Sequence, residues 1–350
     1  MKIGIIGCGM ISGHHLTAVT RYPAATLVGV ADLDLARARA QAERFGAAHA
    51  VDNVAELLAL KPDVVHVLTP PAMHSAVVLQ ALEAGAHIYV EKPMGRSVAE
   101  CNTMTRAALA ARREICVGHN WVYSSAMMRA LELIASGITG EVLQASAAYN
   151  YDVRRNPSFG LQHWAKSLPG GLAEDLAVHP VALLISVLGA PRRTFAVSRS
   201  SMSVPNANTA DVRALIEADR GLGTLSVSIR ARPDMALLDI WCERMLLRLN
   251  ISSMTLTVHR DLPVPRTVAR GLANFDVAGQ LMSSTVRTAW RLLRRKVDGS
   301  YGIVPLVHAF YAALEAGKPA PIGPAEGTQA VAVLRSIWPA LEQATPVRAA

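Results

Sequence analysis

The sequence predicts an α/β protein whose first third forms a parallel sheet covered by helices on both faces. Three observations indicate this fold: an apolar run that ends in a glycine-rich turn, a repeated alternation of apolar runs with helical stretches, and polar residues that follow the apolar runs. With 350 residues, of which 51% are hydrophobic and 18% charged, the chain is long enough for two cores. We expect a dinucleotide-binding domain over 1–120 and a substrate-binding domain over 121–350, with the last helix able to pack back on the first domain.

The first predicted unit is a strand over 2–6, a glycine turn and a helix over 12–20. The turn nearly matches the Gly-x-Gly-x-x-Gly signature, since Gly7 and Gly9 stand in the first two positions and Ser12 in the third. Small residues there let backbone N–H groups approach a pyrophosphate at a helix N-terminus. The predicted cofactor-binding residues of this turn are Gly7, Gly9, Met10 and Ile11.

The second predicted strand, over 25–31, ends at Asp32, at the spacing where such folds place an acid that hydrogen-bonds the adenosine ribose. The Asp32 carboxylate would repel a 2′-phosphate, so we predict NAD as the cofactor in preference to NADP. Asp32 could instead cap the helix predicted over 35–45, although Asp34 can fill that role.

Strands and helices then alternate as far as residue 120. The predicted strands lie within 63–71, 87–93 and 114–120, and the helices over 74–83 and 98–111. Ligands of parallel sheets bind beyond the carboxyl ends of the strands. The polar residues at or just after these ends are Thr69, His74, Glu91, Lys92, His119 and Asn120. This agreement predicts a Rossmann-type domain with its ligands at that edge.

Three motifs carry a resemblance to a known family. "YVEKPMGRS", with Glu91-Lys92-Pro93, resembles the Glu-Lys-Pro motif of the Gfo/Idh/MocA oxidoreductases; "TPPAMH" (69–74) is similar to their Thr-Pro-x-x-x-His loop, and "GGLAEDLAVHPVALL" (170–184) to their Gly-Gly-x-x-x-Asp-x-Gly-x-His helix. The resemblance implies a C-terminal α/β domain with an open, mostly antiparallel sheet that often forms the oligomer contact. It also implies a cis Lys92–Pro93 bond, and it places Thr69, Pro70, His74, Glu91 and Lys92 at the cofactor.

The resemblance further implies that Lys92, Asp175 and His179 meet around the carbon that loses hydride. Oxidising an alcohol needs a base that titrates near neutrality, which suits His179, and Asp175 lies four residues earlier on the same helical face, where it can orient the imidazole. Lys92 would stabilise the developing alkoxide. The chain departs from the family pattern at Ala177, where Gly is usual, and at Ala182, where an Asp is usual.

We therefore expect an NAD-dependent oxidoreductase that transfers a hydride between nicotinamide and a hydroxyl or keto carbon of a sugar, cyclitol or nucleotide-sugar. One alternative is an enzyme that oxidises its substrate transiently for epimerisation or elimination. A second is a non-enzymatic dinucleotide-binding sensor, against which the three reactive residues argue. His119, Asn120 and Trp164 are the predicted substrate-binding residues, although His119 and Trp164 could equally have structural roles.

The four cysteines are scattered without C-x-x-C spacing, so we expect reduced, mostly buried thiols and no metal site. We expect a cytoplasmic protein, because the first strand begins at Lys2 and leaves no room for a signal peptide. We also expect no membrane-spanning segment, because charges interrupt the apolar runs. A homo-oligomer is the expected assembly.

A basic amphipathic helix is predicted near 281–297, in a chain of net charge +8. Its apolar positions are Leu281, Val286, Ala289, Trp290, Leu293 and Val297, and its cations are Arg287, Arg291, Arg294, Arg295 and Lys296. We expect the apolar side to pack on the domain. The alternatives are contact with an anionic membrane surface and a basic rim that receives a diphosphate-bearing substrate. Nucleic-acid binding is not expected, because no accompanying motif is present.

Overall fold

The fold was obtained as a computed structural model, which describes residues 1–159, 163–200, 209–261, 263–293 and 301–342. The chain divides into two compact units. The first comprises residues 1–120 and 302–332, and the second comprises residues 121–301 and 333–350. Each unit has its own sheet and its own core.

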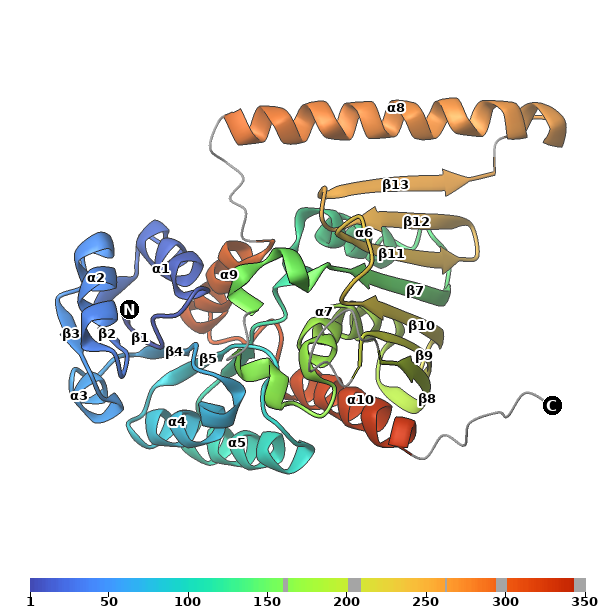
Figure 1. Cartoon of the computed structure of the whole chain (residues 1–350). Coiled ribbons are helices and arrows are strands. Elements are labelled where there is room, and N and C mark those ends of the chain that lie inside the picture. Colours follow the sequence, from blue (N-terminus) through green and yellow to red (C-terminus); the bar gives the residue numbers. More distant parts are fainter. Residues whose placement is uncertain (160–162, 201–208, 262, 294–300, 343–350) are drawn as a thin grey trace. The chain divides into compact units, whose positions relative to one another are not determined.

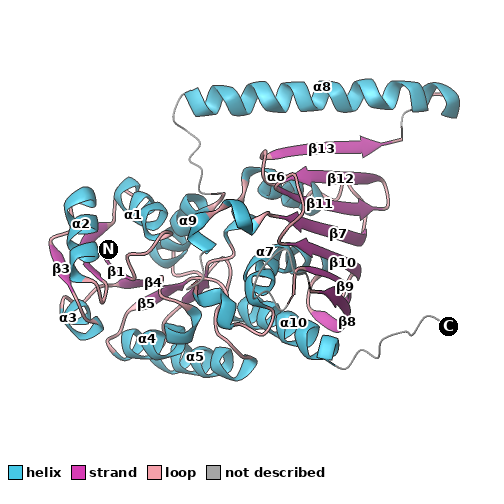
Figure 2. Ribbon diagram, viewed as in Figure 1, coloured by secondary structure: helices cyan, strands magenta, loops and turns pink. Residues whose placement is uncertain are grey.

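The first unit is built on a six-stranded parallel sheet of order β3-β2-β1-β4-β5-β6. This strand order is the one typical of dinucleotide-binding folds, so the predicted Rossmann domain is confirmed. Figure 2 shows the strands flanked by the helices of this unit. The strands are β1 (Lys2–Ile6), β2 (Thr26–Ala31), β3 (His49–Val51), β4 (Val64–Val67), β5 (His87–Val90) and β6 (Ile115–Val117).

The helices of the first unit follow local start and stop signals. Asp34 and Ser97 cap the helices that begin at residues 35 and 98, and Gly46, with a φ of +73°, ends the first of these two. The sequence analysis missed β3 and α3, which span only three and six residues and are too short to show a period. The helices are α1 (Ser12–Arg21), α2 (Leu35–Phe45), α3 (Val54–Ala59), α4 (Pro71–Glu83), α5 (Val98–Ala111), α9 (Ile303–Glu315) and the first part of α10 (Pro324–Glu342).

The second unit contains a seven-stranded sheet of order β13-β12-β11-β7-β10-β9-β8, in which only the β7–β10 pair is parallel. The open, mostly antiparallel sheet implied by the family resemblance is therefore present. Its strands are β7 (Val142–Asn150), β8 (Pro191–Arg199), β9 (Asp211–Ala218), β10 (Gly221–Ser228), β11 (Met235–Cys242), β12 (Met245–Asn250) and β13 (Thr255–Arg260).

Helices α6 (Ser125–Ala135) and α7 (Gly171–Leu188) pack on this sheet. The α7 helix is the one described helix that is long and apolar enough to cross a membrane, but it is mostly buried, as a core helix is. Its N-terminus is held by the last part of α10, because Arg335 pairs with the buried Glu174 and the Trp338 indole lies against Gly170. A Cβ on Gly170 would overlap that indole, so this position requires glycine.

The long helix α8 (Arg266–Leu293) lies alongside the edge strand β13, as Figure 1 shows. Gln280 joins the two: its Oε1 accepts the Val258 N–H at 2.8 Å, and its Nε2 donates to the Val258 carbonyl at 2.9 Å. The expectation that this helix packs its apolar side on the domain is wrong, because Trp290 and Leu293 are 54% and 79% exposed. Arg294, Arg295, Lys296 and Val297 lie outside the described residues.

Candidate functional site

The glycine turn after β1 has the geometry that a dinucleotide needs. Gly7 has a φ of +99°, and a Cβ there would lie 2.8 Å from the Leu68 backbone. A Cβ on Gly9 would meet nothing within 4 Å, so open space adjoins the turn. Ser12 replaces the third glycine without strain, because it is buried and its hydroxyl donates to the Gly9 carbonyl at 2.6 Å. No side chain caps α1, although the N–H groups of Ser12 and His14 donate to the carbonyls of Gly9 and Ile11 at 3.1 Å.

Asp32 lies beside this turn, and its Oδ2 accepts the Cys8 N–H at 2.8 Å. The helix cap is Asp34, whose carboxylate accepts from the N–H groups of Ala36 and Arg37. The capping role considered for Asp32 is therefore filled by Asp34, and Asp32 is not needed for it. The Arg37 guanidinium lies 3.6 Å from the Asp32 carboxylate, so a cation also stands at the predicted ribose position.

The loop after β4 is tied to the loop after β5 by His74. This ring is fully buried, with Nε2 2.8 Å from the Thr69 carbonyl and Nδ1 3.1 Å from the Pro93 carbonyl. Burial lowers the pKa of His74, although the carbonyl contacts oppose that shift. The structure thus gives His74 a positioning role. The buried Thr69 hydroxyl has no hydrogen-bond partner among the described residues, Pro70 beside it is exposed, and Met10 of the glycine turn is 71% exposed.

Glu91 ends a buried hydrogen-bonded chain. His15 Nε2 lies 3.1 Å from Glu91 Oε1, His15 Nδ1 lies 3.0 Å from His66 Nδ1, and His66 Nε2 lies 2.7 Å from the Tyr311 hydroxyl. Although burial by itself raises the pKa of Glu91, the hydrogen bond from His15 and the charges of His15 and Lys92 hold that pKa below its ordinary value. These hydrogen bonds therefore hold the Glu91 carboxylate, in its ionised form, directly before Lys92. Sequence reasoning found no partners for His15 and His66, since only the fold brings them together.

Lys92 follows Glu91, whose Oε2 accepts the Lys92 N–H at 3.2 Å, and the Lys92–Pro93 peptide is cis, as the resemblance implied. Gly118 lets the carboxylate fit, because a Cβ there would lie 2.8 Å from Glu91 Oε1. His119 is buried, and neither of its ring nitrogens has a hydrogen-bond partner in the described part of the chain. Burial, together with the charge of Lys92, lowers the pKa of His119 to about 4. Asn120 is buried next to it in the sequence.

The second unit presents Asp175 and His179 from α7, four residues apart and therefore on one face of the helix. His179 stacks on the Trp121 ring, with centroids 4.5 Å apart and planes 17° from parallel. Trp121 in turn meets Tyr149 edge to face at 4.8 Å. Burial raises the pKa of Tyr149, and the charges of Tyr151 and Asp175 act in the same direction.

A continuous line of aromatic contacts leads from this cluster to Trp164. Tyr149 contacts Tyr151, which meets Phe159 at 5.8 Å between centroids; Phe159 meets His163, and His163 meets Trp164 at 5.4 Å. The sequence analysis named Trp164 but missed Trp121 and Tyr149. The position of Trp121 directly after His119-Asn120 was the one available signal. In the part of the chain that the structure describes, no His, Cys, Asp and Glu side chains gather as a metal site.

A glycine turn at an uncapped helix, an acid after the second strand and a buried Glu-Lys-Pro turn define a dinucleotide-binding oxidoreductase domain. Comparison with known proteins agrees. Residues 1–119 match the model of the oxidoreductase family with an NAD-binding Rossmann fold, and residues 127–248 match the GFO/IDH/MocA C-terminal domain. The chain belongs to the GFO/IDH/MocA family.

Two curated relatives and one solved structure illustrate the similarity. The chain is 30% identical over 195 residues to a D-glucoside 3-dehydrogenase of Escherichia coli (strain K12), covering 55% of each protein. It is 28% identical over 230 residues to an inositol 2-dehydrogenase of Gluconacetobacter diazotrophicus, covering 63% of this chain and 65% of that protein. The matches thus span 55% and 65% of the lengths of these two relatives. An NAD-binding oxidoreductase of Klebsiella pneumoniae superposes over 98% of this chain and 97% of its own, with a TM-score of 0.80 and 22% identity.

Proposed function

We propose that the protein is an NAD-dependent dehydrogenase that moves a hydride between nicotinamide and a hydroxyl or keto carbon of a sugar, cyclitol or nucleotide-sugar. The observation that carries this proposal is His179 on α7, next in the helical face to Asp175 and stacked on Trp121. An imidazole on an aromatic ring, with further rings leading from it, suits a base beside a sugar, because sugar C–H faces pack on aromatic rings. The named activities of the two curated relatives support the same substrate class.

The cofactor would be held by the first unit. Gly7 and Gly9 leave space for the pyrophosphate at the N-terminus of α1, and Asp32 would accept the ribose hydroxyls. The Thr69 hydroxyl would gain a partner from the bound nicotinamide, which supplies hydride transfer when present. The residues present therefore fit a dinucleotide.

Lys92, Asp175 and His179 would act on one substrate carbon. His179 would take the hydroxyl proton as hydride leaves, Asp175 would orient the imidazole, and Lys92 would stabilise the alkoxide. The buried carboxylate of Glu91, hydrogen-bonded to the Lys92 N–H, would keep that lysine in position. His119, Asn120 and Trp164 remain our candidates for substrate contact, to which Trp121 and Tyr149 are now added.

The test is a screen of sugars, inositols and nucleotide-sugars that follows NADH absorbance, together with the Lys92→Ala and His179→Ala variants. We expect each variant to lower kcat by roughly 10²–10⁴ while NADH affinity stays within a few-fold of the parent. Retention of more than about a tenth of the rate would contradict the assignment. Product formation without net NADH would instead favour transient oxidation, as in epimerisation. NADH binding without turnover on any substrate would favour a sensor.

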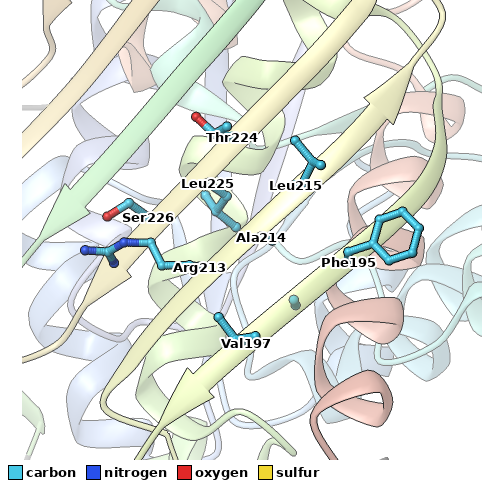
Figure 3. Close-up of a pocket in the computed structure, with 9 residues that line it drawn as sticks. Phe195, Val197, Arg213, Ala214, Leu215, Thr224, Leu225 and Ser226 are labelled. Carbon is cyan, nitrogen blue, oxygen red and sulfur yellow. The ribbon is translucent and has the colours of Figure 1, made fainter. Parts of the chain in front are cut away.

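We further propose that the protein is a homo-oligomer that associates through the open face of its second sheet. This face carries large exposed apolar side chains, namely Leu143, Phe195, Val197, Leu215, Leu222 and Trp241. Figure 3 shows a shallow hollow on it, lined in part by Phe195, Val197 and Leu215. Exposed apolar side chains gathered on one face are typical of a contact surface.

A further inference from the structure

The helix α8 carries an apolar stripe that points away from its own domain. Its members recur at spacings of three, four or seven residues, and each is 45–79% exposed: Val268, Leu272, Phe275, Met282, Val286, Trp290 and Leu293. Gln280, which bonds β13, lies roughly 120° around the helix from the middle of this stripe. Asp276 supports it by accepting from Gln280 Nε2 at 2.9 Å. The helix thus turns a polar side to the sheet and an apolar side outward.

The sequence of α8 is basic. It has one acid, Asp276, against four cations, namely Arg266, Arg270, Arg287 and Arg291. Amphipathic helices with aromatic and aliphatic side chains on one face and Arg or Lys on the other are those that lie in the interface of an anionic bilayer. The segment follows residues 127–248, which match the family's C-terminal domain.

We propose that α8 docks the protein on the surface of a membrane rich in anionic phospholipid, with the stripe among the acyl chains and the arginines among the headgroup phosphates. The apolar stripe could instead pack against a second copy of the chain. Such pairing would bring together two basic helices with one carboxylate each, and the electrostatic repulsion between them would weaken association. An anionic surface complements the same charges. This proposal is independent of the proposed dehydrogenase activity.

The experiment is co-sedimentation of the full chain with vesicles of phosphatidylcholine alone or of phosphatidylcholine with phosphatidylglycerol. We expect binding to the anionic vesicles only, and release at about 0.5 M salt, where charges are screened beyond a few ångströms. The double variant Val286→Ser with Leu293→Ser should raise the lipid concentration for half-binding by about tenfold or more, and Arg287→Glu should raise it several-fold. Both changes affect exposed side chains, so the fold should persist.

The matched control is Leu109→Ser with Ile138→Ser, which removes two apolar side chains of 74% and 55% exposure elsewhere. This variant should bind the vesicles as the parent does. Absence of vesicle binding, equal binding to neutral vesicles, or an equal loss in the control would each overturn the proposal. Light scattering distinguishes membrane docking from contact with a second copy of the chain. If the parent does not bind vesicles and the Val286→Ser with Leu293→Ser variant has a lower mass than the parent, the stripe is a contact between two copies.

Discussion

At the scale of single residues, Asp32 and Arg37 favour different cofactors, NAD and NADP respectively. The carboxylate favours a ribose with free hydroxyls, whereas a guanidinium 3.6 Å away is the group that binds a 2′-phosphate in NADP enzymes. Because Asp32 is the more enclosed of the two, with its side chain 12% exposed against 53% for Arg37, we expect its repulsion to decide for NAD. Arg37 would then serve mainly to neutralise Asp32 until the cofactor arrives.

Asp32→Ser should therefore lower the ratio of the NADPH dissociation constant to that of NADH by about tenfold or more, since it removes the repulsion and frees Arg37. Fluorescence titration with both cofactors measures this ratio. Glu83→Ser is the control, because it removes one exposed carboxylate at the last residue of α4, leaves Asp32 and Arg37 in place, and should leave the ratio unchanged. A parent protein with equal affinities would contradict the NAD preference.

His119 makes stability depend on pH. Its native pKa is about 4, against about 6.5 in the unfolded chain, so unfolding takes up a proton between these values. Its contribution to the free energy of unfolding is complete above pH 6.5 and falls by up to about 1.4 kcal/mol per pH unit as pH drops towards 4.

His119→Gln should reduce the slope of the free energy of unfolding against pH between about 6.5 and 4, because up to one proton fewer is taken up on unfolding. Urea unfolding at a series of pH values measures this slope. An unaltered slope in His119→Gln would mean that His119 has the same pKa in the native and the unfolded chain.

At the scale of elements, the sequence predicted those with a clear period or cap and missed those without one. The units β1–α1 and β2–α2 are visible because an apolar run meets Gly7 or a capping Asp34. The short β3 exists because it pairs with β2 in the sheet, which no local pattern records. The sequence predicted the part of α8 that begins at residue 281 as an amphipathic helix but missed the part from residue 266 to residue 280. The spacing of apolar residues does not say which way the helix faces, and the Gln280 contact that orients it joins residues 22 apart.

The candidate site divides in the same way. Glu91, Lys92, Asp175 and His179 carry motifs and could be named from the sequence. The hydrogen-bonded chain of His15, His66 and Tyr311 could not, because its members come from α1, β4 and α9 and meet only after folding. Trp121 and Tyr149 were missed for the same reason.

The start of α7, which carries Asp175 and His179, depends on glycine at position 170. Gly170→Ala should destabilise the protein by about 2–3 kcal/mol, because the new methyl group must displace the buried Trp338 indole. Gly279→Ala, in the exposed middle of α8 with nothing near its Cβ, should instead stabilise it by up to about 1 kcal/mol. Urea denaturation measures both. Tolerance of Gly170→Ala would mean that Trp338 has room to move.

At the scale of the whole molecule, association through the open sheet face should be measurable without any activity. Light scattering of the parent should give a multiple of the 37.3 kDa chain mass. Phe195→Asp with Leu215→Asp should shift this mass to that of one chain, because these side chains face each other across β8 and β9 and two buried carboxylates would cost several kcal/mol. Val268→Asp on α8 is the control. A monomeric parent would end the proposal.

The Gln280 side chain also has a consequence for how the protein behaves when crowded. An edge strand has unpaired N–H and C=O groups to which a strand of another chain can hydrogen-bond, and such pairing is the first step of fibril growth. At Val258 these groups are already paired, because the Gln280 side-chain amide supplies the same acceptor and donor that a neighbouring strand would supply. Gln280 therefore blocks the addition of a further strand at the β13 edge of the second sheet. A mutation that detaches α8 would expose this edge, and it would lower solubility before it disrupts the fold.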